Sequence, residues 1–248
     1  MSTFAARVWA AIKEFRAIAY VLIVFLMIRI LVFQPFTIPS DSMAPALRVG
    51  DYLILAKWPY GWSRHSLPLS LWPFHGRLFA APPRRGDVVV FKLPRDGRTD
   101  YVKRLIGLPG DRVQLTHGVV QVNGTPLRQE VLGPTVDPDR PSRTVIAIRE
   151  SLPDGGSHVI LRDPDEREGE TTGVYLVPEG QYFFLGDNRD NSLDSRWPRS
   201  VGVGFVPAEN LEGKVELIAF GWRGGASLRK PWTWVSRFDP RRMFRPVD

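Results

Sequence analysis

The feature that most constrains this chain is an apolar run at residues 17–33, which reads AIAYVLIVFLMIRILVF and carries one charge, Arg29. As an α-helix this run would extend about 26 Å, close to the ~30 Å hydrocarbon core of a bilayer. It therefore predicts one membrane-spanning helix. The alternative, a cleaved secretory signal, needs a small-x-small site after the run, and Gln34-Pro35-Phe36-Thr37 stand there instead.

The charges that flank this run predict its orientation. Three cations and one carboxylate precede it: Arg7, Lys13, Arg16 and Glu14. Because positively charged flanks stay on the cytoplasmic side, we expect residues 1–16 to be cytoplasmic and residues 34–248 to lie outside. Arg29 should extend to the outer interface, since a lone helix offers it no interior partner.

Composition predicts a globular body after the run. The chain has 248 residues, of which 44% are apolar, 11% aromatic and 24% charged, too apolar for a disordered polymer. The length fits one large domain with appendages. The lack of Cys excludes disulfides, thiol nucleophiles and Cys-ligated metals, and none of the four His is spaced as His-x-x-x-His. We therefore expect no metal site.

The rest of the sequence predicts a mainly β protein. Gly and Pro number 22 each, which favours turns, and five short apolar runs are typical of strands: 52–55, 88–91, 119–122, 182–185 and 215–218. Asn123-Gly124 favours a type I′ hairpin. No helix signal of comparable strength follows the apolar run. We expect an inserted lobe with long loops at about residues 116–175 and a basic, aromatic tail at 222–248.

Three polar segments stand in unusual surroundings. Ser40 and Ser42 lie in the proline-bracketed segment IPSDSMAP at 38–45, and Lys103 lies in the apolar alternating segment DYVKRLIG at 100–107. In a strand, Lys103 would share its face with Tyr101 and Leu105, opposite Arg104. Burial there would lower the pKa of this lysine. The third segment, GDNRDNSLDSR, fills residues 186–196.

Each segment taken alone has an ordinary explanation. Serines in such a loop are usually turn residues, a lysine in a strand is usually a solvated edge cation, and a run rich in Asp and Asn is usually a loop. The third segment also fails the calcium-loop pattern of an EF-hand, because it lacks Gly at the sixth and Glu at the twelfth position.

Together the segments resemble the motif boxes of bacterial type I signal peptidases, which are membrane-anchored Ser/Lys proteases. The boxes are Ile-Pro-Ser-x-Ser-Met-x-Pro at 38–45, Arg-Gly-Asp-Val-Val-Val-Phe at 85–91, Tyr-x-Lys-Arg-x-x-Gly-x-Pro-Gly-Asp at 101–111 and Gly-Asp-Asn-Arg-Asp-Asn-Ser-x-Asp-Ser-Arg at 186–196. They follow the family's order behind an N-terminal anchor. Two departures stand out: Ala46 replaces the usual Thr, and residues 197–204 add a loop beside the last box.

The resemblance implies a serine/lysine dyad, with Ser42 as the nucleophile and Lys103 as the general base. The Ser42 N–H and the Ser40 hydroxyl would form the oxyanion hole. Ser192 would hydrogen-bond the neutral lysine and fix its direction. Since a free lysine has a pKa of about 10.4, burial must lower it before the amine can accept a proton at neutral pH.

Further residues would support the site or contact the substrate. By the same resemblance, an ion pair between Asp194 and Arg196 would shape the site. The substrate would be the signal peptide of an exported precursor, cut after a small-x-small tripeptide and bound as an added strand along residues 35–40 and 100–103. Two shallow apolar pockets would read its small residues, lined by Phe36, Ile38, Pro39, Met43, Leu47, Leu53, Val90, Asp100, Tyr101 and Val102.

The resemblance also implies the setting of the protein. The fold would be coiled antiparallel sheets outside the bacterial inner (plasma) membrane, on a single-pass anchor with a cytoplasmic N-terminus. The partners would be signal peptides and the phospholipid bilayer, with no cofactor and no nucleic acid. Two other protein classes fit part of the sequence: a self-cleaving repressor-like Ser/Lys protease, which has no need of an anchor, and a non-enzymatic envelope anchor that uses its net charge of +7 to bind nucleic acid or acidic lipid.

Two aromatic segments predict contact with the bilayer surface. Residues 58–81 are rich in aromatic side chains with few charges, and the tail at 222–248 interleaves aromatics with cations. Aromatic rings favour the headgroup boundary and cations favour anionic lipid. We expect Trp62, Trp72 and Trp234 to contribute to this surface; the alternative is that the rings of residues 58–81 pack into the core.

Overall fold

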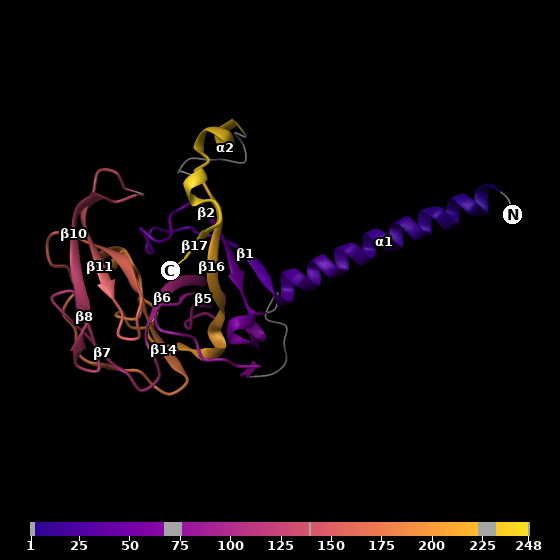
Figure 1. Ribbon diagram of the computed structural model, residues 1–248. Helices are drawn as coiled ribbons and strands as arrows, with labels where there is room; N and C mark the ends of the chain where they lie inside the picture. Colours follow the sequence, from indigo (N-terminus) through magenta and orange to yellow (C-terminus); the bar gives the residue numbers. More distant parts are fainter. Residues whose placement is uncertain (1–2, 67–75, 139, 223–231, 248) are drawn as a thin grey trace.

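The computed structural model describes residues 3–66, 76–138, 140–222 and 232–247. One long helix, α1 (Thr3–Leu31), includes most of the apolar run and extends away from a β-rich body (Figure 1). Many of its apolar side chains are exposed, among them Phe15, Tyr20 and Phe25. Within the described residues, no helix combines the length and apolarity required to cross a membrane.

The body is built on one curled antiparallel sheet of eight strands, so the prediction of a mainly β protein is confirmed (Figure 1). The strand order is β1-β2-β16-β5-β6-β14-β15, with β17 paired to β16. The bounds are β1 (Phe33–Thr37), β2 (Asp51–Ala56), β5 (Val88–Lys92), β6 (Asp100–Gly107), β14 (Gln181–Leu185), β15 (Val206–Pro207), β16 (Leu211–Gly221) and β17 (Arg245–Pro246). Four of the five predicted runs lie inside these strands.

Smaller sheets flank the large one. A four-stranded sheet has the order β13-β7-β8-β9, a three-stranded sheet the order β10-β11-β12, and β3 pairs with β4. The bounds are β3 (Trp62–Ser63), β4 (Arg77–Leu78), β7 (Arg112–Thr116), β8 (Val119–Val122), β9 (Thr125–Pro126), β10 (Arg128–Val136), β11 (Thr144–Ser151), β12 (Ser157–Arg162) and β13 (Tyr175–Leu176). The fifth predicted run is β8.

The predicted hairpin at Asn123-Gly124 is confirmed. Val122 pairs with Thr125, so the turn has two central residues, and their φ angles are 54° and 81°. A type I′ turn requires positive φ at both positions, which Asn and Gly tolerate best.

One short helix, α2 (Trp232–Arg237), lies in the basic tail, where the sequence predicted none. Its six residues make fewer than two turns, too few to display a helical apolar period. Single 3-10 turns occur at η1 (Trp58–Tyr60), η2 (Arg64–Ser66), η4 (Arg189–Asn191), η5 (Ala208–Asn210) and η6 (Pro240–Arg242).

Strands β5 and β6 are buried on both faces. Val88, Val90 and Val102 point into one apolar cluster, whereas Val89 and Leu105 point into another. Because successive side chains alternate across a strand, two-sided burial fits the continuous apolar run of β5, whereas in β6 it also buries two cations, Lys103 and Arg104. This packing places Lys103, the catalytic candidate on β6, in the interior of the body.

Candidate active site

Ser42 lies in the tight loop between β1 and β2. Its side chain is buried, and the residue after it, Met43, is fully buried in the core cluster together with Leu47. The Ser42 carbonyl accepts a hydrogen bond of 3.1 Å from the backbone N–H of Asn188. The core therefore fixes this loop through Met43 and Leu47, and the 186–196 segment fixes it through the hydrogen bond from Asn188.

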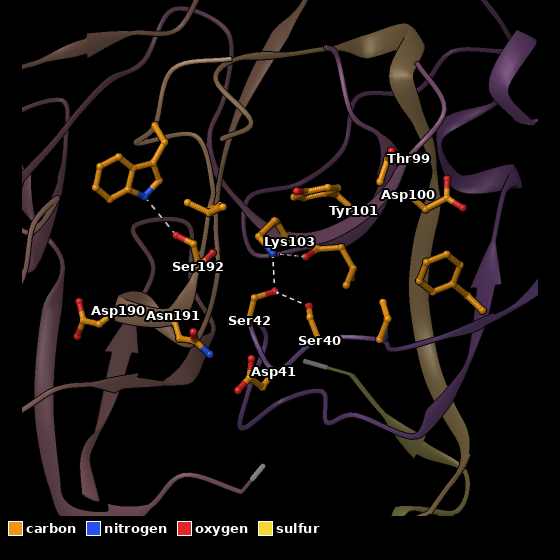
Figure 2. A pocket seen from close by; sticks show the side chains of 15 residues that line it. Ser40, Asp41, Ser42, Thr99, Asp100, Tyr101, Lys103, Asp190, Asn191 and Ser192 are labelled. Atoms are coloured by element: carbon orange, nitrogen blue, oxygen red, sulfur yellow. Dashed lines mark hydrogen bonds between the residues drawn. The ribbon is translucent and has the colours of Figure 1, made fainter. Parts of the chain in front are cut away.

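Lys103 reaches Ser42 from β6. Its Nζ lies 2.6 Å from Ser42 Oγ and 3.0 Å from the carbonyl oxygen of Val102, and the amine stands 5.5 Å from the centre of the Tyr101 ring (Figure 2). Lys103 is 3% exposed. As predicted, it shares a face with Tyr101, whereas Arg104 points to the opposite side and pairs with Asp187 at 2.8 Å.

The environment of Lys103 favours the neutral amine. Burial lowers the pKa of Lys103 to about 8, although the carboxylates of Asp194 and Asp187 act in the opposite direction. Among the described residues no carboxylate forms an ion pair with this lysine. At pH 7 this leaves roughly a tenth of the amine neutral and able to accept a proton, far more than in a free lysine.

Ser40 lies beside the nucleophile candidate. Its Oγ is 3.3 Å from Ser42 Oγ, and its side chain is exposed to the same cavity (Figure 2). In the described part of the chain the Ser42 N–H has no hydrogen-bond partner. One backbone donor and one hydroxyl donor are therefore available next to Ser42 Oγ.

Ser192 lies on the wall of the same cavity, but its hydrogen bonding differs from the expectation. We expected it to bond the lysine, and Lys103 bonds the Val102 carbonyl instead. The Ser192 Oγ is buried, and its hydroxyl helps to hold the pKa of the Asp194 carboxyl below the ordinary value. In this structure the carbonyl of Val102, the residue before Lys103 on β6, is the group that orients the lysine amine.

Asp194 and Arg196 form the expected ion pair, buried behind the dyad. Arg196 Nε lies 2.9 Å from Asp194 Oδ1, and its Nη2 lies 2.9 Å from Oδ2. Burial acts to raise the pKa of Asp194, but Arg196 outweighs it and holds this pKa below the ordinary value. Asp194 also accepts a 3.1 Å hydrogen bond from the Gly186 N–H, so the pair ties both ends of the 186–196 segment together.

The sequence did not single out Asn188 and Asp187 individually. The N–H of Asn188 bonds Ser42, and its side-chain amide lies 3.3 Å from the Asp41 carbonyl, while Asp187 neutralises Arg104. The available signal was the density of Asp and Asn in residues 186–196, which did not indicate which side chains point inward.

A cavity of about 550 Å³ surrounds Ser42 and Lys103. The predicted substrate contacts that line it are Phe36, Pro39, Asp100, Tyr101 and Val102. The other five lie in the core cluster beneath it: Ile38, Met43, Leu47, Leu53 and Val90. Lining residues that the sequence did not predict as substrate contacts include Asp41, Thr99, Asp190, Asn191, Leu193 and Trp197.

Two strand edges border this cavity. β1 is the first strand of the large sheet and pairs on one side only, with β2. On β6, residues 100–103 pair with β5, but pairing with β14 starts only at Arg104. Unpaired backbone groups at such edges are able to bind an extended peptide.

The aromatic segments divide between core and surface. Tyr60 is buried and donates a 2.8 Å hydrogen bond to Asp87, and Trp62 donates one of 2.7 Å to the Leu31 carbonyl at the end of α1. Trp58 and Phe79 are exposed, as are Trp232, Trp234 and Phe244 in the tail. Trp72 and Phe74 lie outside the described residues.

Comparisons with known proteins match this chain to one family. Residues 11–220 match the family model described as signal peptidase, peptidase S26. The chain is 41% identical to a signal peptidase I of Rickettsia typhi over 220 residues, covering 84% of this chain and 80% of that one. It is also 41% identical to a signal peptidase I of Rickettsia akari over 260 residues, covering 94% and 92%. A crystal structure of a signal peptidase I from Enterococcus faecalis V583 is 28% identical, covers 54% of this chain and 97% of that chain, and has a TM-score of 0.32.

Proposed function

Since the chain belongs to the signal peptidase family, peptidase S26, and is a serine endopeptidase of the signal peptidase I type, we propose that Ser42 and Lys103 are its catalytic dyad. The reaction is removal of signal peptides from exported precursors. The observation that carries the proposal is the 2.6 Å contact between a buried amine of lowered pKa and a serine hydroxyl at the wall of a cavity.

The chemistry follows from this contact. Neutral Lys103 takes the proton of Ser42 as Oγ attacks the scissile carbonyl. The Ser42 N–H and the Ser40 hydroxyl stabilise the oxyanion, a contribution of about 10²–10³ in rate per donor. The lysine ammonium then gives its proton to the leaving amine. A water molecule, activated by Lys103, hydrolyses the acyl-enzyme in the second half of the reaction.

We propose that the residues before the cut lie along residues 100–103 of β6, with β1 on their other side. The small-x-small preference would come from the shallow apolar wall formed by Phe36, Pro39, Tyr101 and Val102. Ile38, Met43, Leu47, Leu53 and Val90 support that wall from the core and so limit its depth. Larger substrate side chains are rejected because a packed core does not yield to them.

We propose that the apolar run at residues 17–33 anchors the enzyme in the bacterial inner membrane, with residues 1–16 cytoplasmic and the protease domain outside. The support is the single-charge apolar run at 17–33, the cations before it and the apolar side chains that α1 exposes. The hydrogen bond from Trp62 to Leu31 attaches the end of this helix to the protease body. The site would then lie close to where a precursor leaves the bilayer.

The test is cleavage of a synthetic precursor by the detergent-solubilised full-length protein. We expect one cut after an Ala-x-Ala-type site, no cut by Ser42→Ala, and no cut when the last residue before the site is changed to Leu. Wild-type activity in Ser42→Ala would overturn the dyad. Cleavage of the Leu substrate at the wild-type rate would overturn the specificity.

A further inference from the structure

A second cavity continues the active-site cavity beyond Ser42. Its volume is about 400 Å³, and the two cavities share Asp190, Asn191 and Trp197. The remaining lining residues are Arg140, Arg143, Asp163, Arg167 and Glu168. The two cavities are therefore neighbours, with these three residues between them.

The direction of a bound peptide follows from the proposed function, on which this inference rests. Residues before the cut lie along Asp100 to Lys103, so residues after the cut must leave on the other side of Ser42. Figure 2 shows Asp190, Asn191 and Ser192 on the opposite side of Ser42 from Thr99 and Asp100. The new N-terminus of the mature protein would thus lie against the 190–197 segment.

Trp197 stands at the junction of the two cavities, and its position is fixed by several contacts. Its indole N–H donates to the Ser192 carbonyl at 3.3 Å, and its backbone N–H donates to the Asp194 carbonyl at 3.1 Å. A Cβ at Gly202 would lie 2.5 Å from the Cβ of Trp197, so a larger residue there would displace Trp197 and only glycine fits. The added loop at 197–204 is thus built around a preorganised indole.

The surroundings of the indole match an extended peptide. Leu193, which lines the first cavity, is 49% exposed and provides a second apolar surface. Asn191 Nδ2 and Asp190 Oδ1 are buried and have no hydrogen-bond partner within the described residues. Neither atom contacts solvent, so the peptide contact is assigned to the apolar surfaces of Leu193 and the indole.

We propose that Trp197, with Leu193, forms the subsite for the first residues after the cut and that it favours a large apolar side chain there. The ring offers a wide, rigid apolar surface at little entropic cost. Trp197 is then a specificity-determining residue for the mature end of the precursor, supplied by the loop that this chain adds beside its last motif.

The experiment uses the full chain in detergent and peptides that share one Ala-x-Ala signal portion. The first residue after the cut is Gly, Ser, Asp, Lys, Leu or Phe, and kcat/KM is measured for each. We expect Leu and Phe to exceed Gly by about tenfold in the wild type, the scale of a filled apolar subsite. Trp197→Ala should reduce that ratio to within about twofold of unity while the Gly peptide is still cut, and Trp197→Phe should keep most of the preference.

The matched control is Val201→Ala, in the same added loop and 53% exposed, which lines neither cavity. It should leave the Leu to Gly ratio unchanged. An unaltered ratio in Trp197→Ala would refute the subsite and leave the proposed function standing. Failure of the wild type to cut any of the peptides would instead refute the proposed function.

A second measurement does not depend on any Trp197 variant folding. A peptide with a benzophenone side chain at the second residue after the cut is bound to Ser42→Ala and irradiated, and the cross-linked residues are mapped by mass spectrometry. Cross-links within residues 190–197 support the subsite. Cross-links confined to residues 33–40 or 99–103 overturn it.

Discussion

Lys103 Nζ lies 2.6 Å from Ser42 Oγ, although 61 positions separate the two residues in the chain. The contact depends on two independent placements. The buried side chains of Met43 and Leu47 fix the loop of Ser42, and the two-sided burial of β6 directs Lys103 toward it. A buried amine with no carboxylate partner lowers the stability of the fold. Such groups are typical of functional sites, where the neutral amine takes part in the reaction.

Lys103→Met should abolish turnover and stabilise the fold. Loss of the base lowers kcat at least ~10³-fold. The pKa of Lys103 is about 8 in the folded protein, below the unfolded value, so at pH 7 folding must place a proton in a buried site. The buried proton lowers the free energy of unfolding by on the order of 3 kcal/mol at pH 7. This loss of stability disappears as the pH rises from about 8 toward 10.5. Urea unfolding at pH 7 measures the gain, with Lys214→Met as the partly exposed control; lower stability of Lys103→Met would contradict this account.

The rate should increase with pH. Lys103 accepts a proton only as the neutral amine, so kcat/KM is expected to increase through a pKa of about 8 and then level off. The measurement is initial rate from pH 6 to 10 on one peptide, with a slow substrate to keep chemistry rate-limiting. A flat profile across this range would argue against Lys103 as the base.

Ser40→Ala should retain part of the activity. Its hydroxyl is one of two oxyanion donors, so its loss should lower kcat by about 10²–10³-fold with little change in KM. Ser40→Thr, which keeps the hydroxyl, should recover much of that loss. Ser200→Ala, an exposed serine that lines neither cavity, serves as the control. An effect on KM alone would assign Ser40 to substrate binding instead.

Asp194→Asn should destabilise the protein by about 3–5 kcal/mol, because it leaves Arg196 buried without its counter-charge. Glu130→Gln is the matched control, since it breaks an exposed pair with Arg149 and should cost less than ~1 kcal/mol. Chemical denaturation of both variants measures the difference. Equal stabilities would show that the buried pair does not support the site.

Exposed aromatic residues near α1 and in the tail should aid cleavage in lipid. Trp58, Phe79 and Trp232 are 56%, 83% and 68% exposed. Replacing the three with Ser should lower kcat/KM several-fold in anionic vesicles and leave it unchanged in detergent. The reason is that these side chains stabilise binding of the enzyme only where a bilayer interface is present to bury them. Val131→Ser, 69% exposed on β10, is the control. Equal losses in vesicles and detergent would indicate a folding defect rather than a lipid contact.

Local patterns in the sequence determined much of this protein. The apolar run predicted the second half of α1, the short β-branched or aliphatic runs predicted five strands, and Asn123-Gly124 predicted its turn. These signals succeed because strand alternation and turn conformation depend on neighbouring residues. The same alternation placed Lys103 and Arg104 on opposite faces of β6, and the motif boxes indicated which serines and which lysine to consider.

Only the tertiary structure decided how those residues meet. The curl of the large sheet and the register of its strands bring β6 to the loop of Ser42, give Lys103 the Val102 carbonyl in place of Ser192, and bury Leu53 and Val90 beneath the cavity. They also place Trp197 at the junction of two cavities. Contacts between distant segments depend on how whole elements pack, and no local period in the sequence encodes that packing.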